Sequence, residues 1–138
     1  MNKESVDKLH KGHQAILLTI SRIQQLARSF PQAQMAFSEL DDELLAHWSQ
    51  YNQSFFEQII RNFEGDREVL KMLEFFQHDI RDVKIQYVTI REACEGSPNE
   101  VSVRNFPKDF KAFSEVLVRH IEMEEEYIFP IWKKMADK

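Results

Sequence analysis

The stretch His120-Ile-Glu-Met-Glu-Glu-Glu-Tyr-Ile-Phe-Pro130 places a histidine and a carboxylate four residues apart on a segment without glycine. Residues at positions i and i+4 lie on one face of a helix about 6 Å apart, so His120 and Glu124 can hold one metal centre together. An imidazole with a carboxylate is a ligand set that suits iron, manganese or zinc. The stretch therefore predicts a helix that contributes two ligands to a metal site.

Two other segments of the chain have a similar layout. His47-Trp-Ser-Gln-Tyr51 aligns with the first part of that stretch at an offset of 73 residues, and His13 aligns with His78 at an offset of 65 residues. Each half of the chain thus consists of a helix with one histidine, followed by a helix with a histidine and a partner four residues later. Histidines projecting inward from all four helices would form a buried metal site.

Glycine and proline are rare, and they divide the chain into four long segments. Only three Gly and four Pro occur. We expect helices at residues 3–28, 35–63, 66–95 and 107–134. Apolar residues recur within them every three to five positions, as in the series Leu70, Leu73, Phe76, Ile80, Val83 and Val88. Four such helices with short connections predict an all-α, up-down-up-down four-helix bundle.

The composition fits one globular domain that spans residues 1–138. The net charge of −5 disfavours nucleic-acid binding, because few phosphates would be neutralised. No run approaches the ~18 apolar residues of a membrane span, and the first residues lack the apolar core of a secretory signal. The single cysteine, Cys94, leaves no internal disulfide and fits a reducing compartment. We therefore expect a cytoplasmic protein.

The order of these residues resembles that of a known family. A histidine followed by a His-x-x-x-Glu pair, repeated over four helices, is the pattern of the hemerythrin-like, or HHE cation-binding, proteins. The string from His120 to Pro130 is similar to the family's H-x-x-x-E-E-x-x-hydrophobic-F-P signature. The resemblance covers about residues 9–135 and implies a hemerythrin-like bundle around a non-haem, usually di-iron, centre. In the family this centre binds oxygen, or senses oxygen, iron or nitric oxide.

The resemblance also implies which residues hold the metal. The implied ligands are His13, His47, His78, His120 and Glu124, with Glu124 bridging two ions. The chain departs from the family four residues after His47, where Tyr51 stands in place of the other bridging glutamate.

Three roles are open for Tyr51. A phenolate can ligate ferric iron, and because a phenolic proton with a usual pKa of about 10 must be displaced, iron(III) is favoured over zinc. The phenol can instead donate a hydrogen bond to a metal-bound group, or be a plain core aromatic. Loss of one carboxylate could also leave a single ion, or none.

Two neighbouring side chains are further candidate ligands. Glu74 precedes His78 by four residues and stands where hemerythrins proper carry a histidine, so it can be a substituted ligand. His10 precedes His13 by three residues and lies on nearly the same face, one turn nearer the end of the bundle.

We therefore expect a non-haem iron protein with two ions, or one, that binds or senses dioxygen, nitric oxide or peroxide. Peroxide removal or iron delivery would be an enzyme-like role, for which the sequence offers no dedicated proton donor apart from Tyr51. The alternative is a degenerate, metal-free bundle that acts as a protein-interaction module. The sequence leaves the oligomeric state and any protein partner open.

Overall fold

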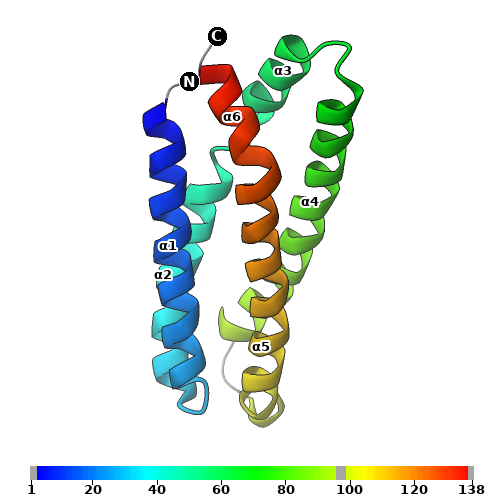
Figure 1. The fold of residues 1–138 in the computed structure, drawn as a ribbon. Helices are drawn as coiled ribbons and strands as arrows, with labels where there is room; N and C mark the ends of the chain where they lie inside the picture. The colour runs from blue at the N-terminus through cyan, green and yellow to red at the C-terminus, as the bar shows by residue number, and fades with distance from the viewer. Residues whose placement is uncertain (1–2, 96–98, 137–138) are drawn as a thin grey trace.

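The computed structural model describes residues 3–95 and 99–136, and in these residues it contains helices and no strand. The helices are α1 (Lys3–Leu26), α2 (Phe30–Trp48), α3 (Gln53–Asn62), α4 (Arg67–Glu95), α5 (Glu100–Met123), the π-helix η1 (Glu124–Ile128) and α6 (Phe129–Ala136). The four long helices α1, α2, α4 and α5 run up and down beside one another, and α3 and α6 lie at one end (Figure 1). The expected all-α four-helix bundle is confirmed.

The core of the bundle is a continuous set of apolar side chains with a large share of aromatic rings. α1 packs on α2, α2 on α4, α4 on α5 and α5 on α1, which closes the ring of four helices. The buried residues of α4 recur at alternating spacings of four and three, the period of one helix face: Val69, Leu73, Phe76, Ile80, Val83, Tyr87, Ile90 and Cys94. Among the described residues, no helix combines the length and the apolar character needed to cross a bilayer.

The helix expected at 35–63 is wrong in two respects: it starts earlier and is broken in the middle. α2 begins at Phe30, with Pro31 in its first turn, where a missing N–H costs nothing. It ends at Trp48, and the side chain of Asn52 accepts a hydrogen bond of 3.0 Å from the backbone N–H of Phe55 to start α3. The turn between the two helices carries Tyr51 into the core.

The helix expected at 107–134 also begins earlier. α5 starts at Glu100, because the side chain of Asn99 caps it by accepting a hydrogen bond of 2.8 Å from the backbone N–H of Ser102. Pro107, which the sequence predicts as the start of the helix, lies inside it. The helix tolerates the loss of one backbone hydrogen bond there because the flanking turns are packed on the core.

The same expected helix contains a wide turn. The backbone N–H of Phe129 donates to the carbonyl of Glu124, five residues back, which defines the π-helix η1. Pro130 follows directly and has no N–H to continue a regular ladder, so a wider turn relieves the clash between its ring and the preceding turn. The wide turn begins at Glu124, and it directs both Glu124 and Glu125 toward α1.

Candidate metal centre

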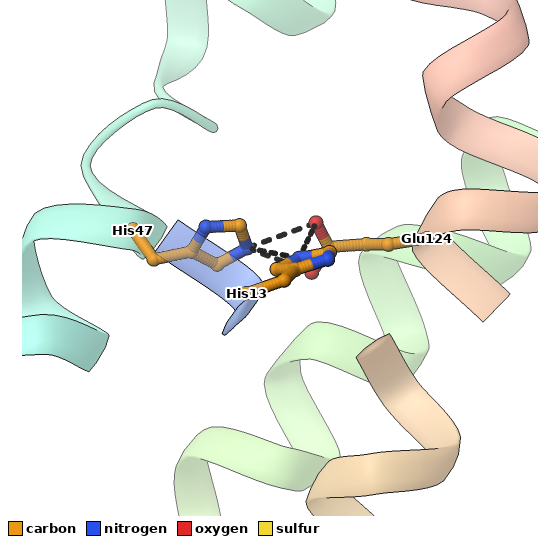
Figure 2. Close-up of side chains that lie close together, drawn as sticks. All are labelled: His13, His47 and Glu124. Carbon is orange, nitrogen blue, oxygen red and sulfur yellow. Dashed lines mark hydrogen bonds and ion pairs between the residues drawn. The ribbon is translucent and has the colours of Figure 1, made fainter. Parts of the chain in front are cut away.

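Three side chains from three different helices meet in the interior of the bundle (Figure 2). His13 comes from α1, His47 from the last turn of α2, and Glu124 from the first residue of η1. Their relative exposures are 1%, 6% and 0%. Each offers one ligand atom, and these atoms all lie within 4.8 Å of one another.

The donor atoms of this cluster point at a common centre. The Nε2 atom of His47 lies 2.9 Å from Oε2 of Glu124, and the Nε2 atom of His13 lies 3.2 Å from the same oxygen. The two Nε2 atoms lie 3.2 Å from each other. Two imidazoles and one carboxylate with converging donors fit a single transition-metal ion with open coordination positions.

His120 lies on the other side of the same carboxylate. Its Nε2 atom is 3.0 Å from Oε1 of Glu124, an ion-pair distance. This buried nitrogen makes no hydrogen bond, because its alignment with the carboxylate is poor. It is therefore free to coordinate a metal ion. The Nδ1 atom lies 2.5 Å from Oδ2 of Asp79, and the ring of Phe76 stacks on the imidazole at 5.7 Å. A histidine held at Nδ1 by a carboxylate is the usual arrangement behind a metal-ligating imidazole.

Tyr51 contacts the cluster through its hydroxyl, which donates a hydrogen bond of 2.6 Å to Oε2 of Glu124. Burial, together with the negative charge of Glu124 and the hydrogen bond to it, raises the pKa of the phenol well above its usual value. Tyr51 is therefore a neutral hydrogen-bond donor in the metal-free protein.

The negative charge of Glu124 and the imidazoles around it stabilise each other's charged forms. Burial alone would raise the pKa of Glu124, but the close imidazoles of His120, His13 and His47 outweigh it and hold that pKa well below its usual range. Burial would likewise lower the pKa of His120, yet its partners Asp79 and Glu124 raise it to about 9. A buried carboxylate is thus kept ionised by the imidazoles around it.

A second carboxylate supports His13 from the surface side. Oε1 of Glu125 lies 3.0 Å from Nδ1 of His13 and 3.3 Å from Nδ1 of His10. Despite its burial, His13 has a raised pKa, because Glu124 and Glu125 favour its charged form. His10 is half-exposed and contacts Glu125 rather than the buried cluster.

The structure does not bring Glu74 and His78 to the cluster. Both side chains are exposed on α4. The positions of α4 that face inward here are Phe76 and Ile80, and His78 is two residues from each. Two residues correspond to about 200° around a helix, so His78 lies on the opposite face.

Asp79 and Glu125 are functional candidates that the sequence reasoning missed. Asp79 lies three residues after Phe76 and directly before Ile80, so the apolar stripe of α4 already placed it at the edge of the inner face. In a regular helix, Glu125 would lie about 100° around the axis from Glu124. The wide turn of η1 brings both side chains to His13 of α1.

One of three comparisons with known proteins gives a match, and it spans most of the chain. A family model described as the hemerythrin HHE cation binding domain matches residues 4–132. The match includes every residue of the cluster. Neither the curated proteins nor the solved structures contain a significant match to the chain.

Proposed function

The chain belongs to the hemerythrin HHE cation-binding domain family, and from this premise we propose that it binds one iron ion between His13, His47 and Glu124. The observation that carries the proposal is the convergence of three buried donor atoms within 4.8 Å of one another. Two histidines and one carboxylate with open positions are the ligand set of non-haem iron(II) sites.

Bound iron would supply an open coordination position at which dioxygen, nitric oxide or peroxide can bind. The side chains of the chain itself hold the ion, exclude water and orient the carboxylate. His13 and His47 would provide imidazole nitrogens, and Glu124 would offset the charge of the ion in a site closed to bulk water. Tyr51 donates a hydrogen bond to the ligating carboxylate, which favours the donor role over that of a phenolate ligand.

The residues that α4 places near Glu124 support the proposal of one ion. The resemblance implied two ions, with Glu124 bridging them. The Oε1 atom of Glu124 lies 3.0 Å from Nε2 of His47, which the first ion would use, and 3.0 Å from Nε2 of His120, which is the further donor that the described residues offer there. Phe76 occupies the inward position of α4 beside it. A second ion would therefore have two protein ligands and bind weakly, so we propose one firmly held ion.

A metal-free interaction module is the second candidate function. Its support is that most polar atoms of the cluster already have hydrogen-bond partners without an ion. An exposed groove of about 490 Å³ lined by Phe75, Tyr127 and two methionines offers an apolar surface for a partner.

We also propose, from the sequence, that the protein is cytoplasmic and that residues 1–138 form a single domain.

Metal content per chain tests the proposal most directly. Protein loaded anaerobically with iron(II) should retain about one ion per chain after gel filtration, and its visible spectrum should change on addition of nitric oxide. Glu124→Gln and His47→Ala should each lose the ion. His78→Ala, which removes an exposed histidine of α4, is the matched control and should retain it.

Three outcomes would contradict parts of the proposal. Two tightly held ions would overturn the one-ion assignment and restore the family's usual centre. Loss of the ion in His78→Ala would overturn the ligand set. No iron, zinc or manganese above trace would leave the interaction module as the function.

A further inference from the structure

The buried cluster needs a route by which a ligand can reach it, and one surface cavity ends at a side chain that contacts it. This cavity, here called the Tyr51 groove, has a volume of about 520 Å³. It is lined by Tyr51 and Phe56 on one side and by Gln77, Ile80, Arg81 and Lys84 of α4 on the other, among others. We propose that the Tyr51 groove admits a small inorganic anion to the metal centre, an inference that rests on the proposed function.

Tyr51 links the groove to the centre. The same side chain lines the groove and donates its hydrogen bond to Oε2 of Glu124. With an exposure of only 5%, its ring separates the ligand oxygen from the groove. A ligand in the groove is therefore one side chain away from the carboxylate that holds the ion.

The groove lies between α4 and the turn that joins α2 to α3. α2 ends at Trp48 and α3 starts at Gln53, and the groove is lined by Tyr51 of this turn, by Phe56 of α3 and by residues of α4. Gln77, Arg81 and Lys84 follow one another at spacings of four and three, which places them on one stripe of α4. The turn and this stripe form the two walls.

The charge of the groove favours an anion. Arg81 and Lys84 are exposed, and within the described part of the chain neither makes an ion pair. The Nζ atom of Lys84 lies 5.6 Å from the centre of the Trp48 ring, and Lys84 lines both the Tyr51 groove and the neighbouring cavity that Trp48 lines. No acidic residue lines the groove. In a chain of net charge −5, two unpaired cations over apolar walls would concentrate small anions at this place.

Cysteine reactivity in the metal-free protein tests the route without any ion. Tyr51→Cys places a thiol at the inner end of the groove, and Ile80→Cys places one on its wall in case the first variant does not fold. An anionic methanethiosulfonate reagent should react faster than a cationic one by about tenfold, after normalisation to free cysteine. The native Cys94 should stay unreactive, because burial raises the pKa of its thiol to about 12.

Charge-removal pairs show whether the groove causes this preference. Arg81→Gln with Lys84→Gln should abolish it. Lys108→Gln with Lys111→Gln, which removes the same charge from exposed sites of α5, should leave it intact. Equal rates with the two reagents, or an equal loss in both charge-removal pairs, would overturn the inference.

Azide binding to the iron-loaded protein tests the route to the centre itself. The double variant of Arg81 and Lys84 should lower the association rate constant by about tenfold and weaken its salt dependence, with the dissociation rate constant unchanged. Ala15→Leu fills a different cavity, of about 300 Å³, which borders His47, and should not slow azide.

The two arms separate this inference from the proposed function. The association rate constant of azide could be unchanged in the double variant of Arg81 and Lys84 but lower in Ala15→Leu. In that case the proposed route is wrong, and the proposed metal centre is still supported. If the protein takes up no iron, the proposed function fails, and the thiol experiment alone decides whether the groove admits anions.

Discussion

Glu124 is a fully buried carboxylate with four polar side chains around it. Two histidines and Tyr51 share its Oε2 atom, and His120 lies beside Oε1. An isolated charge at this depth would be strongly destabilising, so the surrounding donors are needed to keep the carboxylate ionised. The same donors are arranged so that an ion can replace the shared protons.

Tyr51→Phe separates the ligand role of the phenol from the donor role. The variant should keep its iron, because the ring still fills the same space. It should lose about 1.5–3 kcal/mol of unfolding free energy in the metal-free state, because a hydrogen bond to a charged group is removed. Denaturant titration and iron analysis measure both quantities.

Tyr127→Phe is the control for this experiment, since that hydroxyl is on a partly exposed residue of η1. It should change neither quantity. If Tyr51→Phe lost its iron while remaining folded, the phenol would be a ligand after all.

Asp79→Asn tests the partner that holds His120. The neutral amide removes the charge facing Nδ1, so the pKa of His120 should fall from about 9 toward its usual value. An NMR titration of the metal-free protein reports this pKa directly. An unchanged titration would show that Glu124 alone sets the charge of His120.

At the scale of the elements, the short turn between α2 and α3 is what distinguishes this bundle from one built of four unbroken helices. It ends α2 directly after His47 and directs Tyr51 inward. On the other side of the cluster, the π-helix places the carboxylate of Glu124 at Nε2 of His13 and that of Glu125 at Nδ1. Irregular backbone on both sides of the cluster therefore positions the polar groups.

Two capping asparagines allow the turn to be tested against a matched control. Asn52→Ala and Asn99→Ala each remove an N-cap, so each should cost about 1 kcal/mol of stability. Only Asn52→Ala loosens the turn that follows the proposed ligand His47, and only this variant should weaken iron binding. Thermal unfolding and competitive iron titration measure the two effects, and equal iron affinities would show that His47 needs no capped turn after it to hold the ion.

At the scale of the whole molecule, stability should depend on pH with opposite signs in the metal-free and iron-loaded states. The pKa of His120 is raised to about 9 in the folded state, so its stabilising contribution is complete below the unfolded value near 6.5 and is lost as the pH rises through 9. Metal-free protein should thus lose on the order of 1–3 kcal/mol between these limits.

The iron-loaded protein should show the reverse trend. The ion competes with protons for the histidines, so its binding strengthens as the pH rises. Melting temperatures of both forms from pH 6 to pH 9 check the prediction. Parallel curves for the two forms would mean that the ion does not bind at the histidines.

The all-α fold was predictable because its signal is local. Apolar residues at helical spacing and the scarcity of glycine and proline determine where helices form, whatever surrounds them. The pairing of His120 with Glu124 was predictable for the same reason, since i and i+4 on one helix are neighbours in any fold. The inner face of α4 could also have been derived, because Phe76 and Ile80 belong to a stripe that excludes His78.

Other features depend on contacts between distant segments, and only the tertiary structure decided them. The break before Asn52 and the wide turn at Glu124 depend on how the core packs and on where Pro130 falls, so helical periodicity could not reveal them. The proposal of one ion rests on Phe76 of α4 facing His120 of α5, a contact between helices. By itself the sequence determined that the chain is helical, and it supplied most of the candidate ligands. Packing decided which of these candidates share one buried centre, because burial and convergence are properties of several helices together.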